Sequence, residues 1–273
     1  DTYWSLCYAK IRKCNVVIEK AEEYTGTESI AASVATAKFF RAYQYFWLLE
    51  RFGGVPLVTR TLSTGSEELY AARNSRYEVV GQILSDLTDA INGLPDESSY
   101  DGKVTKQGAQ AFKARVLLFE ATWEKYVKET TDGNGTSEGA GSAKPSGYPS
   151  VESMLTEAAS LADAVISSKK YSLWSAEGTV YENIAYNYLF NLEDENTNPM
   201  GYKKDLNKEY ILQVCHDPVS NKCSKNITHA YAGSNITLKW MNMVPCISDG
   251  LPYFYSKDYK GFNKMTDIYD NRD

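Results

Sequence analysis

The chain has 273 residues, 23% of them charged, and a formal net charge of −6. This length and composition allow one large globular domain or two small ones. The acidic balance argues against a nucleic-acid-binding protein, because phosphate binding needs a basic face. No run of about 18 apolar residues, the length that crosses a bilayer, occurs in the sequence.

The first predicted helix spans about residues 2–24. Its apolar residues recur at intervals of three and four and form one stripe, which consists of Trp4, Cys7, Ile11, Cys14, Ile18 and Ala21. Cys7 and Cys14 lie two turns apart, about 10 Å, which is too far for a disulfide, so we interpret them as small core residues. A short connection at Thr25-Gly26 predicts that the next helix is an antiparallel neighbour.

The second predicted helix, from about Thr27 to Gly53, is the most aromatic part of the chain. Thr27 is the expected N-cap, with Glu28 in the positive first turn, and Gly53 the expected end before Pro56. One apolar face consists of Ala35, Phe39, Ala42, Phe46 and Leu49. A second face consists of Phe40, Tyr43 and Trp47. Two apolar faces predict a helix that is packed on both sides.

Two further helices form a second predicted hairpin after a polar loop at residues 61–74. The first begins at Ser75, with Glu78 in capping-box position, and ends near Gly93 and Pro95. The other begins near Thr105 and carries its apolar stripe to Tyr126. The two hairpins do not follow the regular interval of ~34 residues, so they predict an irregular tetratricopeptide-like array.

The rest of the chain is less regular. Residues 128–149 are rich in Gly, Ser and Thr and predict a flexible loop. The loop contains the start of a calcium-loop pattern, but Ala143 stands where the closing Glu is required, so we predict no metal there. A fifth helix is predicted at about 150–168. Beyond it, only Glu209–Val214 reads as a strand, and we expect loops over residues 171–273.

Several motifs follow one another along the chain. They are W-x-x-x-Y-x-x-I-x-x-C-N at residues 4–15, A-x-F-x-R-A-x-x-Y-F-x-L-x-x-x-F-G-x-V-P-L-V at 37–58, I-L-x-D-L-x-x-A-I-x-x-L-P at 83–95, V-T-K-x-x-A-x-A-x-K-A-R-V-L-L at 104–118, K-Y-S-L at 170–173, D-G-L-P at 249–252 and Y-D-N-R-D at 269–273. Together and in this order they resemble the SusD/RagB family, whose members are surface glycan-binding lipoproteins of Bacteroidetes.

The resemblance implies a mainly α-helical, tetratricopeptide-like domain over residues 1–273, with a helical base at about 1–170 and a loop-rich binding region at about 171–273. It implies a non-catalytic protein without cofactors that binds oligosaccharide or polysaccharide at the cell surface. The expected partner is a SusC-like TonB-dependent outer-membrane transporter. Family members carry a signal, a lipid-bearing cysteine and a C-terminal continuation, so we expect these residues to belong to a longer protein. Membrane attachment is expected only through such a lipid anchor.

Aromatic residues outside the helices are the candidate glycan-binding residues. A sugar packs its C–H face on a ring while its hydroxyls find polar partners. Family members are similar in placing such rings on loops above the helices. The candidates are Trp240, Tyr231 and Trp174 for stacking, and Asn235, Asn242 and Asp249 for the hydroxyls. We interpret Trp4, Trp47 and Trp123 as core residues. The 21 tyrosines are equally compatible with simple filling of a loop-rich fold.

The sequence patterns that would indicate other functions are weaker. Cys215, His216, Cys223 and His229 are possible zinc ligands, but their spacing does not match a zinc site, although Cys215 and Cys223 could form a disulfide. A glycoside hydrolase needs two carboxylates about 5–10 Å apart, and the acidic run at 193–195 cannot be paired from sequence. A helical-repeat module that binds peptides or proteins is the alternative to glycan binding.

Overall fold

The structure is a computed structural model, and it describes residues 2–96, 102–127, 144–174 and 208–212. All of these residues lie in one compact unit, residues 1–215. The predicted single domain over 1–273, with its loop-rich region at 171–273, therefore stays a prediction. The described helices are α1 (Thr2–Glu22), α2 (Ala31–Phe52), the short 3-10 helix η1 (Glu67–Tyr70), α3 (Arg76–Gly93), α4 (Lys106–Tyr126) and α5 (Val151–Ser167).

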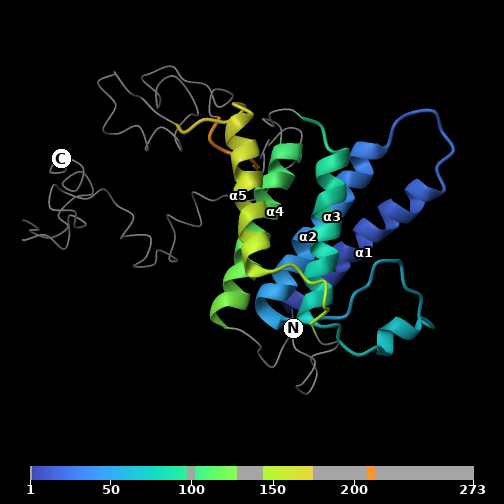
Figure 1. The fold of residues 1–273 in the computed structure, drawn as a ribbon. Helices are drawn as coiled ribbons and strands as arrows, with labels where there is room; N and C mark the ends of the chain where they lie inside the picture. Colours follow the sequence, from blue (N-terminus) through green and yellow to red (C-terminus); the bar gives the residue numbers. More distant parts are fainter. Residues whose placement is uncertain (1, 97–101, 128–143, 175–207, 213–273) are drawn as a thin grey trace, which may run out of the picture. The chain divides into compact units, whose positions relative to one another are not determined.

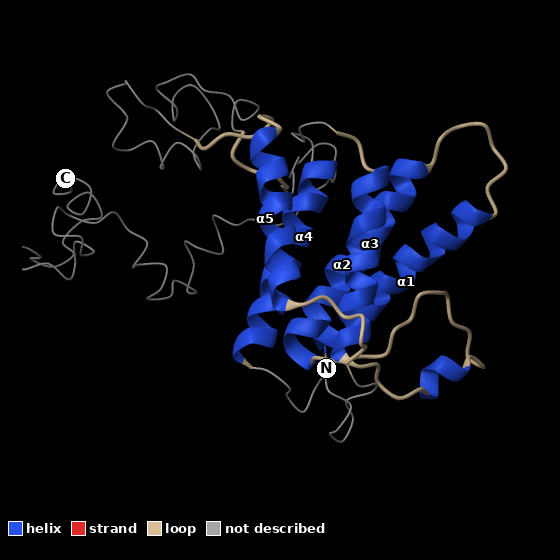
Figure 2. Ribbon diagram, in the orientation of Figure 1, coloured by secondary structure: helices blue, strands red, loops and turns tan. Residues whose placement is uncertain are grey.

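Each long helix contacts the one before it along the chain, and α1 and α5 lie on opposite sides of the helical array (Figure 1). The described residues contain no strand (Figure 2), which confirms the mainly α-helical fold of irregular hairpins. The predicted strand at 209–214 is wrong as far as it is described, because residues 209–210 have no regular secondary structure and residues 211–212 form a bend. Among the described residues, no helix is both long and apolar enough to cross a membrane.

The first residues of α3, α4 and α5 agree with the predicted helix starts, and the capping box predicted at Ser75 is present. Ser75 and Glu78 form a capping box, in which Glu78 N donates to Ser75 Oγ at 3.2 Å and Ser75 N donates to Glu78 Oε2 at 2.7 Å. Thr105 and Ser150 likewise accept hydrogen bonds from the backbone N–H three residues ahead. These bonds satisfy donors that the first turn of a helix leaves without backbone partners.

The predicted start of α2 is wrong. The helix begins at Ala31, and its N-cap residue, Ile30, makes no side-chain cap bond. The carbonyl of Ile30 accepts the first hydrogen bonds of the helix, from Ser33 and Val34, so Thr27 lies too early to cap it. The other end is as predicted, because Gly53 has a φ of 64°, which suits glycine, and its N–H donates to the carbonyl of Leu49 at 3.0 Å.

The core is built around α2. All five residues of its first predicted face are buried. On this face Phe39 and Phe46 meet Phe112 of α4, with ring centroids 5.6 and 5.5 Å apart, and Phe46 also meets Phe119 edge-on at 5.3 Å. A fully buried phenylalanine contributes roughly 1.5–3 kcal/mol, so this aromatic cluster is a major stabilising contact.

The second predicted face of α2 is not buried as expected. Phe40 is 40% exposed and Trp47 is 38% exposed, so the interpretation of Trp47 as a core residue is wrong. The helix is packed on both sides, but its second contact runs through Tyr45 and Leu48, and Tyr45 meets Tyr8 of α1 at 6.5 Å. With α1 on one side and the phenylalanines of α4 on the other, the side that carries Phe40 and Trp47 stays open.

A buried arginine joins three helices. Arg41 of α2 donates to both carboxylate oxygens of Asp86 on α3, from Nε at 2.8 Å and from Nη2 at 2.7 Å. Its Nη1 donates to Asn15 Oδ1 of α1 at 2.9 Å. All three side chains are buried. A buried charge is tolerated only when it is paired and hydrogen-bonded, so this arrangement fixes the positions of α1, α2 and α3 relative to one another.

A second buried pair performs the same task for α3 and α4. Arg76 donates to Glu120 Oε2 from Nε at 3.0 Å and also from Nη2. Tyr148, which precedes α5, donates to the other carboxylate oxygen of Glu120 at 2.8 Å. The guanidinium of Arg76 lies 4.3 Å from the ring centroid of Trp123. Glu120 therefore connects α3, α4 and the segment that leads into α5.

The Asp86→Asn substitution should destabilise the chain strongly. It leaves the charge of Arg41 buried without its counter-ion, and breaking a buried pair in this way costs about 3–5 kcal/mol. We would measure the free energy of unfolding from urea titrations followed by circular dichroism. Glu23→Gln is the matched control, because the Lys20–Glu23 pair is exposed and exposed pairs contribute little. Equal effects of the two substitutions would contradict the role given to Arg41 and Asp86.

Candidate functional site

Residues 55–62 form an extended segment that runs beside α1, and we call it the exit segment because it leaves α2. Several side chains of α1 hold it. Tyr8 donates to the carbonyl of Pro56 at 2.7 Å. Asn15 Nδ2 donates to the carbonyls of Val58 and Arg60, at 2.9 and 3.0 Å. Glu19 accepts hydrogen bonds of 2.6 Å from both the N–H and the hydroxyl of Thr61.

Other side chains hold the exit segment from the core side. The hydroxyl of Tyr45 accepts from Val58 N at 2.7 Å and donates to the carbonyl of the same residue at 3.0 Å. Arg41 Nη1 donates to the carbonyl of Thr59 at 3.1 Å, and Asn74 Oδ1 accepts from Leu57 N at 2.8 Å. Backbone groups in a protein interior need such partners, and here side chains take the place that a neighbouring strand has in a sheet.

A hollow of about 420 Å³ lies between α1, the exit segment and η1, and we call it the loop hollow. Its apolar and aromatic wall includes Trp4, Tyr8 and Leu69, and its polar lining includes Arg12, Arg60 and Glu68. The Trp4 ring packs against Phe52 edge-on at 5.2 Å and against Tyr8 at 5.1 Å. The loop hollow thus combines a fixed indole ring with charged groups that can exchange hydrogen bonds with a ligand.

A separate polar hollow of about 840 Å³ is lined by Arg60 and by residues of the segment 63–71, which includes η1. The two hollows share Arg60 and Glu68. This pair has distances of 2.7 Å from Nε and 2.5 Å from Nη2 to Glu68 Oε1. The pKa of the Glu68 carboxyl is lowered, because hydrogen bonding by its own backbone N–H and pairing with Arg60 outweigh its partial desolvation. Glu68 therefore offers a charged acceptor at neutral pH.

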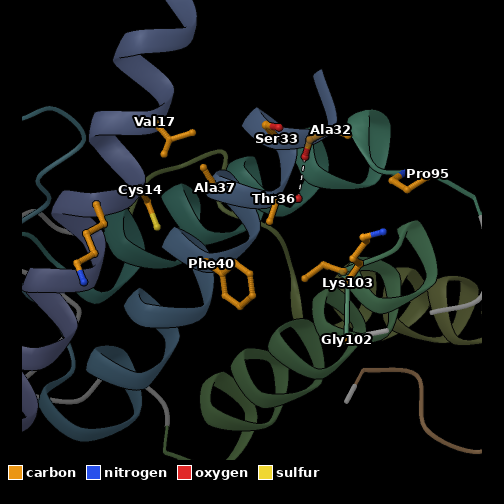
Figure 3. A pocket seen from close by; sticks show the side chains of 12 residues that line it. Cys14, Val17, Ala32, Ser33, Thr36, Ala37, Phe40, Pro95, Gly102 and Lys103 are labelled. Carbon is orange, nitrogen blue, oxygen red and sulfur yellow. Dashed lines mark hydrogen bonds between the residues drawn. The ribbon is translucent and has the colours of Figure 1, made fainter. Parts of the chain in front are cut away.

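A different hollow, of about 610 Å³, lies between α1, the N-terminal half of α2 and the connection from α3 to α4 (Figure 3). We call it the helix hollow. On α2 its lining consists mainly of small side chains, with the ring of Phe40 beside them, and Lys13 and Lys103 contribute from α1 and from the connection. Thr36, one of the small residues, uses its hydroxyl to donate to the carbonyl of Ala32 at 2.7 Å. The helix hollow therefore suits an apolar occupant better than a sugar.

Trp174 is the one predicted glycan-binding residue that falls within the described ranges. It is half-buried, and its backbone N–H donates to Glu209 Oε2 at 2.6 Å. The same segment is tied to its surroundings by the hydroxyl contact between Tyr171 and Thr105 at 3.3 Å, and by the bond from Ser172 N to the carbonyl of Lys208 at 3.1 Å. The ring of Trp174 is thus carried by a segment with defined contacts.

The other predicted site residues, Trp240, Tyr231, Asn235, Asn242 and Asp249, lie outside the described residues, so their roles stay predictions. The same holds for the cysteines and histidines at 215–229 and for the acidic run at 193–195. Within the described ranges, no group of three or more acidic, histidine or cysteine residues could hold a metal ion. Cys7 and Cys14 are buried as predicted, and burial raises the pKa of both thiols.

The loop hollow was not predicted from the sequence. Residues 61–74 read only as a polar loop, and the pairing of Arg60 with Glu68 depends on the path of that loop. One usable signal was present, because Asn15, Arg41 and Tyr45 are polar or amphipathic residues inside motifs that are otherwise apolar. Buried polar side chains are hydrogen-bonded, so their presence pointed to a backbone segment for them to hold.

Comparisons with known proteins agree with the helical part of the structure. Residues 1–118 match the SusD-like family model described as starch-binding, associating with outer membrane. The SusD-like protein P38 of Formosa agariphila is 34% identical over 123 residues, which is 44% of this chain and 24% of that protein. The SusD-like protein P2 of the same organism is 30% identical over 130 residues, 47% of this chain and 26% of that protein.

A solved structure shows the same fold. The crystal structure of a SusD-like protein from Bacteroides fragilis has a TM-score of 0.55 and 25% sequence identity, over 79% of this chain and 33% of that one. The matches to the two Formosa agariphila proteins each span only about a quarter of those proteins. These likenesses confirm the resemblance that the motifs indicated.

The stability of the chain should fall as the pH rises from about 10 to about 12. Burial raises the pKa of Tyr45 to about 12, whereas an unfolded tyrosine has a pKa of ~10. The unfolded state therefore loses its proton first, which favours unfolding within this window by up to ~1.4 kcal/mol per pH unit. Below pH ~10 the tyrosine is protonated in both states, and this contribution does not change with pH.

The measurement is the free energy of unfolding at several alkaline pH values for the unmodified chain, Tyr45→Phe and Tyr70→Phe. Tyr45→Phe should lower stability at pH 8, because Val58 N loses its partner, and should make the alkaline decline shallower. Tyr70 is 86% exposed, so Tyr70→Phe should follow the unmodified chain. A decline of unchanged steepness in Tyr45→Phe would contradict the proposed burial of this hydroxyl.

Proposed function

We propose, from the match of residues 1–118 to the SusD-like family model, that this chain binds oligosaccharide or polysaccharide at the cell surface without cleaving it. The observation that supports the proposal most is the match to a family model described as starch-binding and associating with outer membrane. We further propose that the whole protein hands the bound glycan to a SusC-like TonB-dependent transporter in the outer membrane, to which it is held by a lipid anchor.

The proposed mechanism needs a rigid base and exposed rings. The two buried ion pairs, Arg41 with Asp86 and Arg76 with Glu120, make the helices a base whose parts do not shift independently. Rings carried by residues 171–273 stack on the C–H faces of sugar units, and polar side chains accept and donate hydrogen bonds to the hydroxyls. We assign stacking to Trp240, Tyr231 and Trp174, and hydroxyl contacts to Asn235, Asn242 and Asp249.

Binding of a peptide or protein is the second candidate function. The helix hollow and the half-exposed Phe40 and Trp47 favour it, because an apolar groove beside a helix suits an apolar peptide face. A ligand of this kind would contact α2 rather than residues 171–273. The two functions therefore predict different responses to substitution of Trp47 and of Trp240.

We would titrate the full chain with a panel of polysaccharides in a calorimeter. Trp240→Ala should weaken the measured glycan affinity by about tenfold, the equivalent of ~1.4 kcal/mol, because a stacking face is lost. Trp47→Ala is the matched control and should leave the glycan affinity unchanged. The same samples are assayed for released reducing sugar, and none is expected from a protein that only binds.

Four results would contradict the proposal or its assigned residues. An absence of binding across the panel would exclude glycan recognition by this chain. An unchanged affinity in Trp240→Ala would remove the assigned ring, and a loss confined to Trp47→Ala would favour the helix face instead. Release of reducing ends would identify the chain as a hydrolase.

A further inference from the structure

We propose that the loop hollow is a second saccharide-binding site, which holds one unit of a neutral oligosaccharide on the helical base. This inference rests on the proposed function and adds to it a site formed by Trp4, Arg12, Arg60, Glu68 and Leu69. These residues come from α1, the exit segment and η1. None of them belongs to the region at 171–273 to which the glycan contacts were assigned.

The loop hollow offers the two kinds of surface that a sugar requires. The indole of Trp4 is half-buried and held by Phe52 and Tyr8, so it forms a fixed wall for the C–H face of a sugar. Leu69, which also lines the hollow, is 52% exposed. A ligand that covered this exposed apolar surface would remove it from water, which favours binding. The hollow lies within the range of ~300–1,000 Å³ that is common for small-molecule sites.

The polar lining points to a neutral ligand. The guanidinium of Arg60 and the carboxylate of Glu68 supply a donor and an acceptor side by side, which matches a sugar hydroxyl that donates and accepts. Arg12 donates to the carbonyl of Leu62 at 3.2 Å and keeps further N–H groups. The two arginines are balanced by Glu68 in the hollow and by Glu67 in the adjoining one. This balance gives little attraction for an acidic sugar.

The rigidity of the exit segment makes the loop hollow ready for a ligand. Tyr8, Asn15 and Glu19 fix its backbone against α1, and Tyr45 fixes it from the core. Arg60 therefore projects from a backbone that does not have to be ordered when the sugar binds. A site that is already ordered binds more tightly, because less conformational entropy is lost.

The helix hollow does not carry the same inference. The part of its lining that α2 contributes consists mostly of small side chains, and the hydroxyl of Thr36 already donates to the carbonyl of Ala32 in the same helix. It contains no acceptor and donor pair comparable to Arg60 and Glu68 among its described lining residues. A sugar placed there would find donors in Lys13 and Lys103 but no charged acceptor like Glu68 among the described lining residues, and a hydroxyl that loses its acceptor in water without a replacement opposes binding.

Hydrogen exchange of the full chain, read by mass spectrometry, follows every peptide at once and so locates a bound sugar wherever it lies. The probes are maltoheptaose, cellohexaose and a xyloglucan heptasaccharide, each in excess over the chain. With a saccharide that binds, we expect slower exchange in peptides that cover residues 60–71. Slower exchange in residues 171–273 with no change at 60–71 would overturn this inference and leave the proposed function standing. No change anywhere with all three probes would contradict both.

Two substitutions test the chemistry of the loop hollow. Glu68→Gln and Leu69→Ser both change exposed or half-exposed side chains, so the fold should persist, and each should weaken the affinity for that saccharide about five- to tenfold. Glu23→Gln is the matched control, because Glu23 also pairs with a cation, Lys20, but lies outside the hollow. The control should bind like the unmodified chain. Unchanged affinity in both Glu68→Gln and Leu69→Ser would overturn the inference, whatever Trp240→Ala does.

Discussion

The arrangement of the described helices depends on the hydrogen bonds and the ion pair that the buried guanidinium of Arg41 makes. Arg41 lies on the central helix α2 and directs its donors to Asp86 of α3, to Asn15 of α1 and to the carbonyl of Thr59 in the exit segment. Taking a charge out of water is costly unless its donors find partners. The geometry of four segments is thereby tied to one side chain, and a shift of any of them would leave a buried charge without compensation.

The same requirement explains why a helical array carries a well-placed extended segment. Residues 55–62 have no neighbouring strand among the described residues, yet their backbone groups are bonded to side chains of α1, α2 and Asn74. The aromatic contacts of Phe39 and Phe46 with α4 provide the apolar burial, whereas the polar contacts decide where the chain goes after Gly53. The position of Arg60, and with it the loop hollow, follows from that path.

The helices could be predicted from the sequence because their signals are local. The capping box at Ser75 and Glu78 and the end at Gly53 lie within a few residues of the features they define. The open side of α2 could not be predicted, because apolar periodicity shows that Phe40 and Trp47 share a face but not whether another segment covers it. The pair of Arg60 and Glu68 was missed for a similar reason, since it depends on how a polar loop folds back.

The most direct test is amide hydrogen exchange of Leu57, Val58 and Thr61, resolved by NMR. Each of these N–H groups donates to a side chain, respectively that of Asn74, Tyr45 and Glu19. If side chains hold the exit segment, the three amides should exchange far more slowly than those of an unstructured peptide, at rates like those inside α2. Exchange as fast as in an open loop would show that side chains do not hold the exit segment. It would contradict the account of a preformed loop hollow.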